Sequence, residues 1–296
     1  GSSPLEAPAT LSLIAQVEMD GVWSIDGGMQ ELVRCLARLC QQQGVTFRYQ
    51  TTCEQILVKN GKIAGVSLAS QEDLKADRVV FNGDACALRQ GLLGQATQRA
   101  VPTSKPPRSL SAVTWCMRTR TRGLRLDRHN LFFQSDYADE FTDIFQQQRL
   151  PRRPTVYLCA QDRPSAVEDL DTERLLCLIN APANGDESGL SEQALSECET
   201  QVLRSMRQCR LHIEITPDNH VRNTPSHFHR RFPGTGGALY GQATHGWMSI
   251  FSRPGSISPI PGLFLAGGSV HPGPGRSEEH TSELQSLRHL VCRLLL

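Results

Sequence analysis

The segment that most constrains this chain is residues 261–275, PGLFLAGGSVHPGPG. An apolar stretch from Leu263 to Ala266 runs into Gly267 and Gly268 and then into a turn rich in proline and glycine. Glycines at the carboxyl end of a strand let backbone N–H groups approach a pyrophosphate closely, and a following helix N-terminus favours negative charge. An ordinary loop fits the same letters. The segment favours a cofactor-binding edge of a sheet and leaves the plain loop as the alternative.

The first hundred residues contain a helix followed by short strands. Residues 29–43 carry leucines at helical spacing and end at Gly44, which predicts an amphipathic helix. The runs 45–52, 54–69 and 73–84 are rich in β-forming residues, and Asn60-Gly61 supplies a two-residue hairpin turn. The apolar run at residues 79–81 predicts a buried strand of a cofactor domain.

A proline-rich linker over residues 100–108 leads into a second region. The pattern predicts a strand at 109–119, then strand, acidic-aromatic helix and strand over 130–161, a strand at 175–182, a helix at 192–209 and a strand at 211–216. This alternation predicts a mixed sheet with a helical cover, and hence a mixed α/β or α+β fold class.

The overall charge excludes one class of function. A net charge of +1 lacks the electrostatic footprint of a nucleic-acid-binding protein. A local basic run is formed by Arg118, Arg120, Arg122, Arg125 and Arg128. We interpret it either as a solvated face or as a surface that docks onto an anionic membrane.

Metal sites and transmembrane segments are not expected. The ten cysteines contain no C-x-x-C pair and lie mostly among apolar neighbours, so neither zinc nor disulfides are predicted. His227 and His229 alternate as on a strand, but no third ligand accompanies them. No apolar run reaches the roughly 20 residues that span a bilayer, and the first residues carry no signal-peptide pattern.

The two ends of the chain have separate interpretations. The in-frame translation of a common short-read sequencing adapter accounts for every residue from Arg276 to Leu296, which predicts an artefactual tail. The alternative is an amphipathic C-terminal helix. Gly1 is not a methionine, and the opening residues indicate a longer parent protein. No G-x-G-x-x-G occurs, because the glycines of GTGGALYG (234–241) have another spacing.

Four stretches together resemble one family. They are residues 21–36 with 41–56, residues 76–88, residues 230–255 and residues 261–275. In this order they are similar to the phytoene desaturase family of carotenoid desaturases, which belongs to the amine-oxidase-like flavoprotein superfamily. The stretch 230–255 most resembles the hydroxycarotenoid 3,4-desaturase branch. The resemblance covers nearly all of residues 1–275.

The resemblance implies a cofactor, FAD, and a division of the chain. It implies a partial FAD-binding Rossmann-like domain and a substrate domain. The expected division is 1–22 as a substrate or helical segment, 23–100 as an FAD-domain segment, 101–255 as the substrate-binding domain, 256–275 as the return to the FAD domain, and 276–296 as the tail. The expected cofactor-binding residues are Cys53, Gly267, Gly268, Ser269, His271, Gly273 and Gly275. A strand cysteine in the core explains Cys53 equally well, and His271 could simply order its loop.

The implied reaction is the removal of two hydrogens from a C40 polyene, with hydride passing to the flavin and a proton lost from the neighbouring carbon. Candidate residues of an apolar substrate channel are Trp23, His245, Trp247 and Phe251; core packing would explain them as well. No catalytic side chain is identified. Trp115, Phe132 and Phe133 allow the same two interpretations, channel lining or core packing. The carotenoid substrate implies a cytoplasmic enzyme peripherally associated with the inner photosynthetic membrane.

Two other classes remain open. One is a different flavin oxidoreductase, either a phytoene desaturase or a retinol saturase-like or amine oxidase-like enzyme, because these share the glycine signature. The other is a non-enzymatic binding fragment, because the expected first strand and glycine turn that hold the ADP half of the cofactor are not in this sequence. The chain by itself is therefore expected to be inactive.

Overall fold

The computed structural model describes residues 3–7, 19, 23, 25–134, 136–163, 172–187, 189–245, 252–271 and 273. Three candidate site residues, Trp247, Phe251 and Gly275, lie outside the described residues. The stretch 276–296, which we interpret as an artefactual tail, lies outside them too. The described elements include helices, antiparallel sheets and one parallel strand pair, which confirms the predicted mixed fold class.

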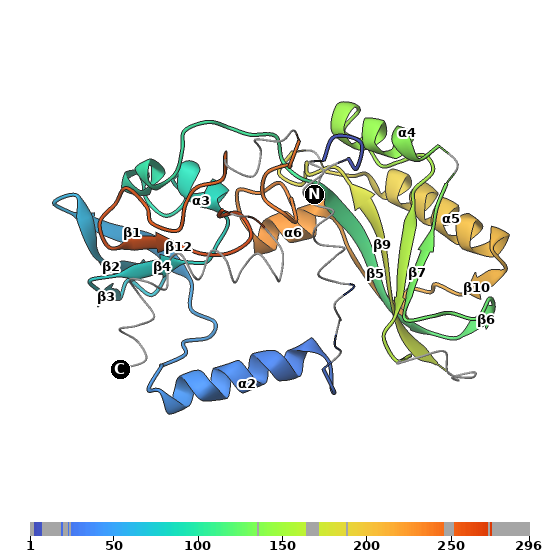
Figure 1. Ribbon diagram of the computed structural model, residues 1–296, viewed down its shortest axis with the longest axis horizontal. Coiled ribbons are helices and arrows are strands. Elements are labelled where there is room, and N and C mark those ends of the chain that lie inside the picture. Colours follow the sequence, from blue (N-terminus) through green and yellow to red (C-terminus); the bar gives the residue numbers. More distant parts are fainter. Residues whose placement is uncertain are drawn as a thin grey trace.

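The larger sheet has five antiparallel strands covered by helices on one side (Figure 1). Its order is β11 (His220–Asn223), β5 (Ser111–Thr119), β9 (Glu173–Ala181), β8 (Val156–Ala160) and β7 (His129–Phe132). Alternate residues of β8 and β9 are buried, as expected when one face of a sheet meets a core. The predicted strands at 109–119 and 175–182 are therefore confirmed.

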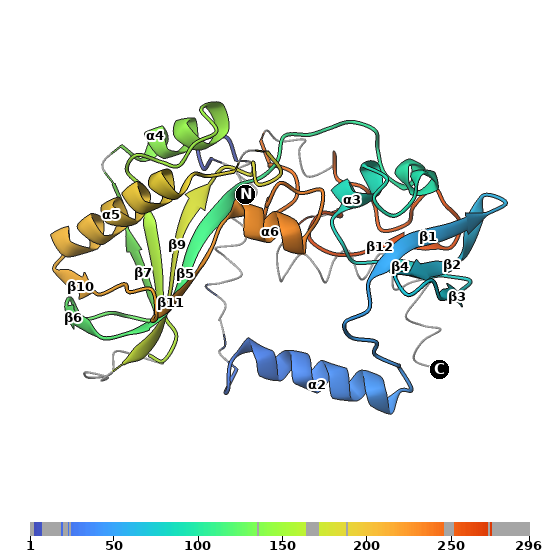
Figure 2. The ribbon, with the colours of Figure 1, turned by 180° about the vertical axis from the view of Figure 1, so that it is seen from behind.

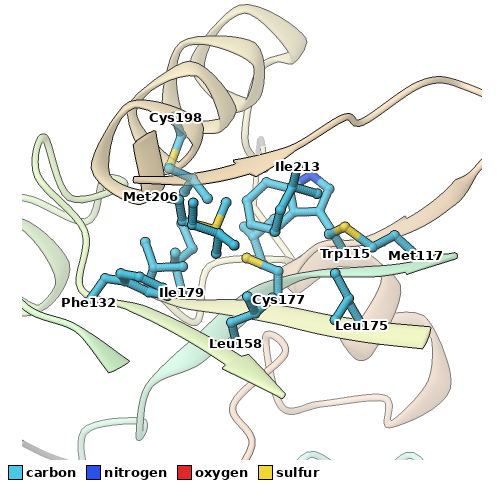
Figure 3. Close-up of a cluster of buried hydrophobic side chains, with 14 of the residues drawn as sticks. Trp115, Met117, Phe132, Leu158, Leu175, Cys177, Ile179, Cys198, Met206 and Ile213 are labelled. Atoms are coloured by element: carbon cyan, nitrogen blue, oxygen red, sulfur yellow. The ribbon is translucent and has the colours of Figure 1, made fainter. Parts of the chain in front are cut away.

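Helix α5 (Glu192–Gln208) covers this sheet and completes its core. Ser191 caps the helix by accepting a hydrogen bond from the N–H of Ala194. Leu195, Cys198, Val202 and Met206 recur at helical spacing on the buried face. Figure 3 shows Cys198 and Met206 of this helix above the sheet residues that they meet. The short helix α4 (Tyr137–Phe141) lies beside it (Figure 1).

Trp115 brings a polar indole N–H into this core. Its ring is fully buried, and its indole N–H donates to Glu199 Oε2 at 2.8 Å. Phe132 is buried in the same cluster, whereas Phe133 is exposed. Core packing, rather than a channel, therefore accounts for Trp115 and Phe132.

The smaller body contains an antiparallel sheet and a parallel strand pair (Figure 2). The sheet is β1 (Cys53–Lys59), β2 (Lys62–Leu68) and β3 (Asp73–Lys75), and the pair is β4 (Val79–Phe81) with β12 (Leu263–Leu265). Asn60 and Gly61 both have positive φ, 50° and 79°, which confirms the predicted hairpin turn. The helix α3 (Ala85–Arg89) and the 3-10 helix η2 (Gln95–Ala100) pack beside these strands.

Helix α2 (Met29–Gln42) is the predicted amphipathic helix, and it lies apart from both sheets (Figure 1). Gly44 follows it with φ of +82°, in agreement with the expected stop. None of its residues is buried, so the leucine stripe at Leu32, Leu36 and Leu39 is exposed. Within the described part of the chain no element covers this stripe.

Three local expectations were wrong. Residues 45–52 form no strand, because none of the described strands provides a hydrogen-bonding neighbour for them. Val80 is 59% exposed, so β4 is not buried on both faces as its apolar run predicted. His227 and His229 lie on the helix α6 (Pro225–Arg231), where Pro225 begins the first turn, and not on a strand.

Two polar contacts join separate segments. Arg163 and Glu173 are both buried, and the guanidinium donates to both carboxylate oxygens, at 2.7 and 2.8 Å. Arg108 pairs with Asp186 and also donates to the carbonyl of Ala183, which links the entry of β5 to the loop after β9.

The buried Arg163–Glu173 pair and the exposed Arg174–Asp162 pair, which adjoin at the start of β9, predict variants of very different stability. The variant R163M leaves the Glu173 carboxylate buried without its cation, so we expect a loss of about 3 kcal/mol or more in the free energy of unfolding. The variant R174M removes an exposed partner of Asp162 and should cost at most about 1 kcal/mol. Urea unfolding of both variants measures the contrast. Equal losses would contradict a structural role for the buried pair.

The Arg108–Asp186 pair predicts a dependence of stability on pH. The hydrogen bond from Arg108 lowers the pKa of Asp186, so the pair stabilises the fold above the ordinary carboxylate pKa of about 4. This stabilisation is lost as pH falls through the lowered pKa of the folded state. The free energy of unfolding of D186N should therefore fall less with decreasing pH below about pH 4 than that of the unaltered protein. R108Q should show the same reduced slope, and an unchanged slope in both variants would contradict the assignment.

Candidate functional site

The candidate site lies where the parallel strands β4 and β12 end. Leu265 pairs with Phe81 in the parallel register, and the N–H of Ala266 donates to the carbonyl of Phe81 at 3.0 Å. Parallel strands end at the same edge, so the glycine loop after β12 meets the start of α3 after β4. Ligands of open α/β sheets bind outside such carboxyl ends.

A direct hydrogen bond holds the two loops together. The N–H of Ala85, in the first turn of α3, donates to Ser269 Oγ at 3.0 Å. Asp84 caps the same helix by accepting from the N–H of Cys86 at 2.8 Å. Gly241 completes the cluster, because a Cβ there would lie 3.1 Å from that of Ser269. Residues from three distant parts of the sequence therefore form one loop cluster.

Arg253 stabilises this cluster through hydrogen bonds to backbone carbonyls. Its side chain is almost completely buried, and Nη1 donates to the carbonyls of Gly268 at 2.8 Å and Tyr240 at 3.1 Å. Nη2 donates to the carbonyl of Gln242 at 3.0 Å. Arginine suits this task because its rigid fork presents several donors at fixed angles. The loop of Gly268 is thus held against residues 240–242.

The backbone of the loop fits an anionic group. Gly267 has φ of +106°, and a Cβ there would meet the Asn82 side chain at 3.3 Å. Within the described residues, the N–H groups of Gly267, Gly268 and Ser269 have no protein acceptor. Consecutive N–H groups of this kind can form a concave site for phosphate oxygens. The residues present therefore fit one phosphate-bearing end of a dinucleotide such as a flavin cofactor.

The structure brings together some of the predicted cofactor residues. Gly267, Gly268 and Ser269 lie in the loop after β12, and His271 and Gly273 follow them. The N–H of His271 donates to the carbonyl of Pro254 at 2.8 Å, which ties down its loop. Cys53 lies elsewhere, because it begins β1 and pairs there with Leu68. Burial raises the pKa of the Cys53 thiol, in keeping with a strand cysteine.

Of the candidate channel residues, the structure describes Trp23 and His245, and no contact between these two is found. Trp23 is 82% exposed. His245 stacks edge-on against Phe145 at 4.8 Å and lies 3.3 Å from a carboxylate oxygen of Glu6. A cavity of about 550 Å³ beside α6 is lined by the charged residues Glu192 and Arg222, so it does not match an apolar channel for a polyene. The channel stays a prediction.

Sequence reasoning missed three residues of the loop cluster. Asp84 could have been found, because an aspartate directly after an apolar strand and before a short helix is a typical N-cap. Gly241 and Arg253 gave no such signal, because their roles depend on contacts with residues far along the chain. Only the folded arrangement identifies them.

The nearest cysteine is not activated. Burial and the neighbouring Asp84 raise the pKa of Cys86 to about 11, so its thiol stays protonated at neutral pH. Among the described residues there is no group of three or more histidine, cysteine or acidic side chains that could hold a metal ion. No helix in the described part of the chain has the length and apolar character of a membrane span.

Comparison with known proteins supports a flavin site. The family model described as "Flavin containing amine oxidoreductase" matches residues 9–275. The chain is 55% identical over 93% of its length to the hydroxyneurosporene desaturase of Rubrivivax gelatinosus, of which it covers 53%. It is 39% identical to the enzyme of the same name from Cereibacter sphaeroides, covering 93% of this chain and 55% of the relative.

A third relative is the 1-hydroxycarotenoid 3,4-desaturase of a Flavobacterium species, which is 31% identical over 93% of this chain and 56% of the relative. The chain thus spans about half the length of the curated relatives that it matches. The family match runs through the four stretches noted in the sequence and includes the whole described loop cluster. The chain belongs to the flavin-containing amine oxidoreductase family.

Proposed function

We propose that this chain is part of an FAD-dependent carotenoid desaturase, which introduces a 3,4 double bond into a hydroxylated C40 polyene. The observation that carries the proposal is the loop cluster at the carboxyl ends of β4 and β12, whose N–H groups without an acceptor among the described residues fit a phosphate-bearing cofactor. The names of the relatives at 55% and 31% identity support the carotenoid substrate class. The relatives' names also make hydroxylated carotenoids the first substrates to test.

The chemistry that the bound flavin supplies is a two-electron oxidation of the polyene. The residues of this chain would bind the cofactor and hold it in position. The N–H groups of Gly267, Gly268 and Ser269 would donate hydrogen bonds to cofactor oxygens. Arg253 would hold their loop in place through its hydrogen bond to the carbonyl of Gly268. The N-cap at Asp84 and the Ser269 hydroxyl fix the start of α3 beside them. No side chain in this cluster is required as a nucleophile.

The proposal extends to the division of the chain and to its location. Residues 23–100 and 256–275 would belong to the flavin domain, and residues 101–255 to the substrate domain, with β5 and β9 as the centre of its sheet. Cys53, His271, Gly273 and Gly275 remain proposed cofactor contacts, and His245, Trp247, Phe251 and Trp23 remain proposed channel residues. Because carotenoids dissolve in bilayers, we propose a cytoplasmic enzyme that lies on the inner photosynthetic membrane.

A chimera tests the activity. Residues 9–275 would replace the matching stretch of the Rubrivivax gelatinosus relative, and the purified protein would be given hydroxylated carotenoids. Because each added conjugated double bond lengthens the chromophore, we expect a shift of carotenoid absorption to longer wavelength. The unaltered relative is the positive control. A folded, flavin-loaded chimera that oxidises amines and leaves carotenoids unchanged would favour the amine oxidase class instead.

Within the same chimera, the glycine loop can be tested separately. G267V should lose most of the flavin absorbance, because valine is strained at φ of +106° and its branched side chain would crowd the Asn82 side chain. G255A is the matched control, because a Cβ there has no atom within 4 Å. We expect G255A to keep stoichiometric flavin. Equal flavin content in both variants would show that this loop does not hold the cofactor.

A further inference from the structure

A basic cavity lies beside the strands β6 (Thr121–Gly123) and β10 (Leu211–Ile213). Figure 1 shows these two strands at the far end of the five-stranded sheet from β4 and β12. Its volume is about 450 Å³. The lining comprises Arg118, Thr119, Arg120, Arg122, Thr172, Arg207, His212, Ile213 and Glu214. Four arginines and a histidine thus face one carboxylate. This concentration of charge contrasts with the net charge of +1 of the whole chain.

The fold explains why these cations converge. Arg118 is an outward residue of β5, because the residues on either side of it, Met117 and Thr119, are buried. The chain then turns into β6 (Thr121–Gly123), which pairs with β10 (Leu211–Ile213) and places Arg122 opposite His212. Arg207 joins them from the last turn of α5. The carboxylate of Asp162 pairs with Arg174 and also attracts Arg118.

An apolar side chain projects beside the cations. Leu124 is 40% exposed, and its N–H donates to the carbonyl of Arg210 at 3.0 Å. The backbones cross closely here, because a Cβ on Gly123 would lie 2.0 Å from the Arg210 carbonyl oxygen. The crossing holds Leu124 between exposed arginines on both sides. Arginines around an exposed leucine are typical of surfaces that lie at a membrane interface.

We propose that this face, formed by β6, β10 and the end of α5, docks onto a bilayer that contains anionic phospholipids. The cavity would receive a phosphate headgroup, because several guanidinium groups converge on it. Leu124 would enter the interface beside it. The inference deepens the proposed function by naming the surface that meets the membrane, and its test does not depend on desaturase activity.

Vesicle binding by the 296-residue chain tests the docking surface. One set of vesicles is pure phosphatidylcholine, and the other is an equal mixture of phosphatidylcholine and phosphatidylglycerol. We expect binding to the anionic set that weakens as salt rises. R122Q/R207Q should bind roughly 25-fold more weakly, at about fivefold for each arginine near an anionic surface. K62Q/K75Q removes the same number of positive charges from the sheet of β1, β2 and β3, and should bind like the unaltered chain.

The outcomes are distinguishable. Equal binding to both vesicle sets, or unchanged anionic binding by R122Q/R207Q with an unaltered circular dichroism spectrum, would overturn the proposal. Inorganic phosphate provides the other arm of the test. Inorganic phosphate would be added at the concentration of the phosphatidylglycerol in the vesicles. If it binds the chain without vesicles and abolishes vesicle binding, the cavity is a soluble-phosphate site and the membrane proposal fails. Loss of binding confined to R122Q/R207Q would support docking even if the chimera proved inactive on carotenoids.

Discussion

The parallel pairing of β4 with β12 is the contact on which the candidate site depends. It joins residues 79–81 to residues 263–265, which are separated by the whole five-stranded region. Both strands are short, so their register is secured by the apolar packing of Leu263 and Leu265 against Ile56 and Ile63 rather than by the ladder alone. Because the strands are parallel, the loops that follow them end at one edge. The site exists only when the intervening chain folds back.

Polar contacts then set the fine geometry of the edge. Arg253 spans from residues 240–242 to Gly268, and Ser269 receives the first N–H of α3. These bonds are largely shielded from water, so breaking one leaves a buried polar group unpaired. They hold the glycine loop in a shape in which the N–H groups of Gly267, Gly268 and Ser269 have no protein acceptor among the described residues. Such a preformed loop lowers the entropy that cofactor binding would otherwise cost.

The centre and the far end of the five-stranded sheet have different physical roles. Its centre is a packed core in which Trp115, Cys177 and Met206 meet, and burial raises the pKa of the Cys177 thiol until it behaves as a small hydrophobe. Its far end turns outward into β6 and β10 and collects arginines that a packed core could not hold.

Local patterns in the sequence determined helix α2, helix α5, the Asn60-Gly61 hairpin and the strand of residues 263–265, because periodicity and turn chemistry act over a few residues. They also predicted a loop with Gly267, Gly268 and Ser269 at the end of an apolar strand, because glycines there let the backbone approach a ligand closely. The tertiary structure alone decided that β4 pairs with β12, that Arg253 and Gly241 join the loop, and that Cys53 lies on another sheet. It also placed His227 on a helix and left residues 45–52 without a strand partner. These facts depend on contacts between residues far apart in the chain, and a local pattern carries no information about which distant segment will be its neighbour.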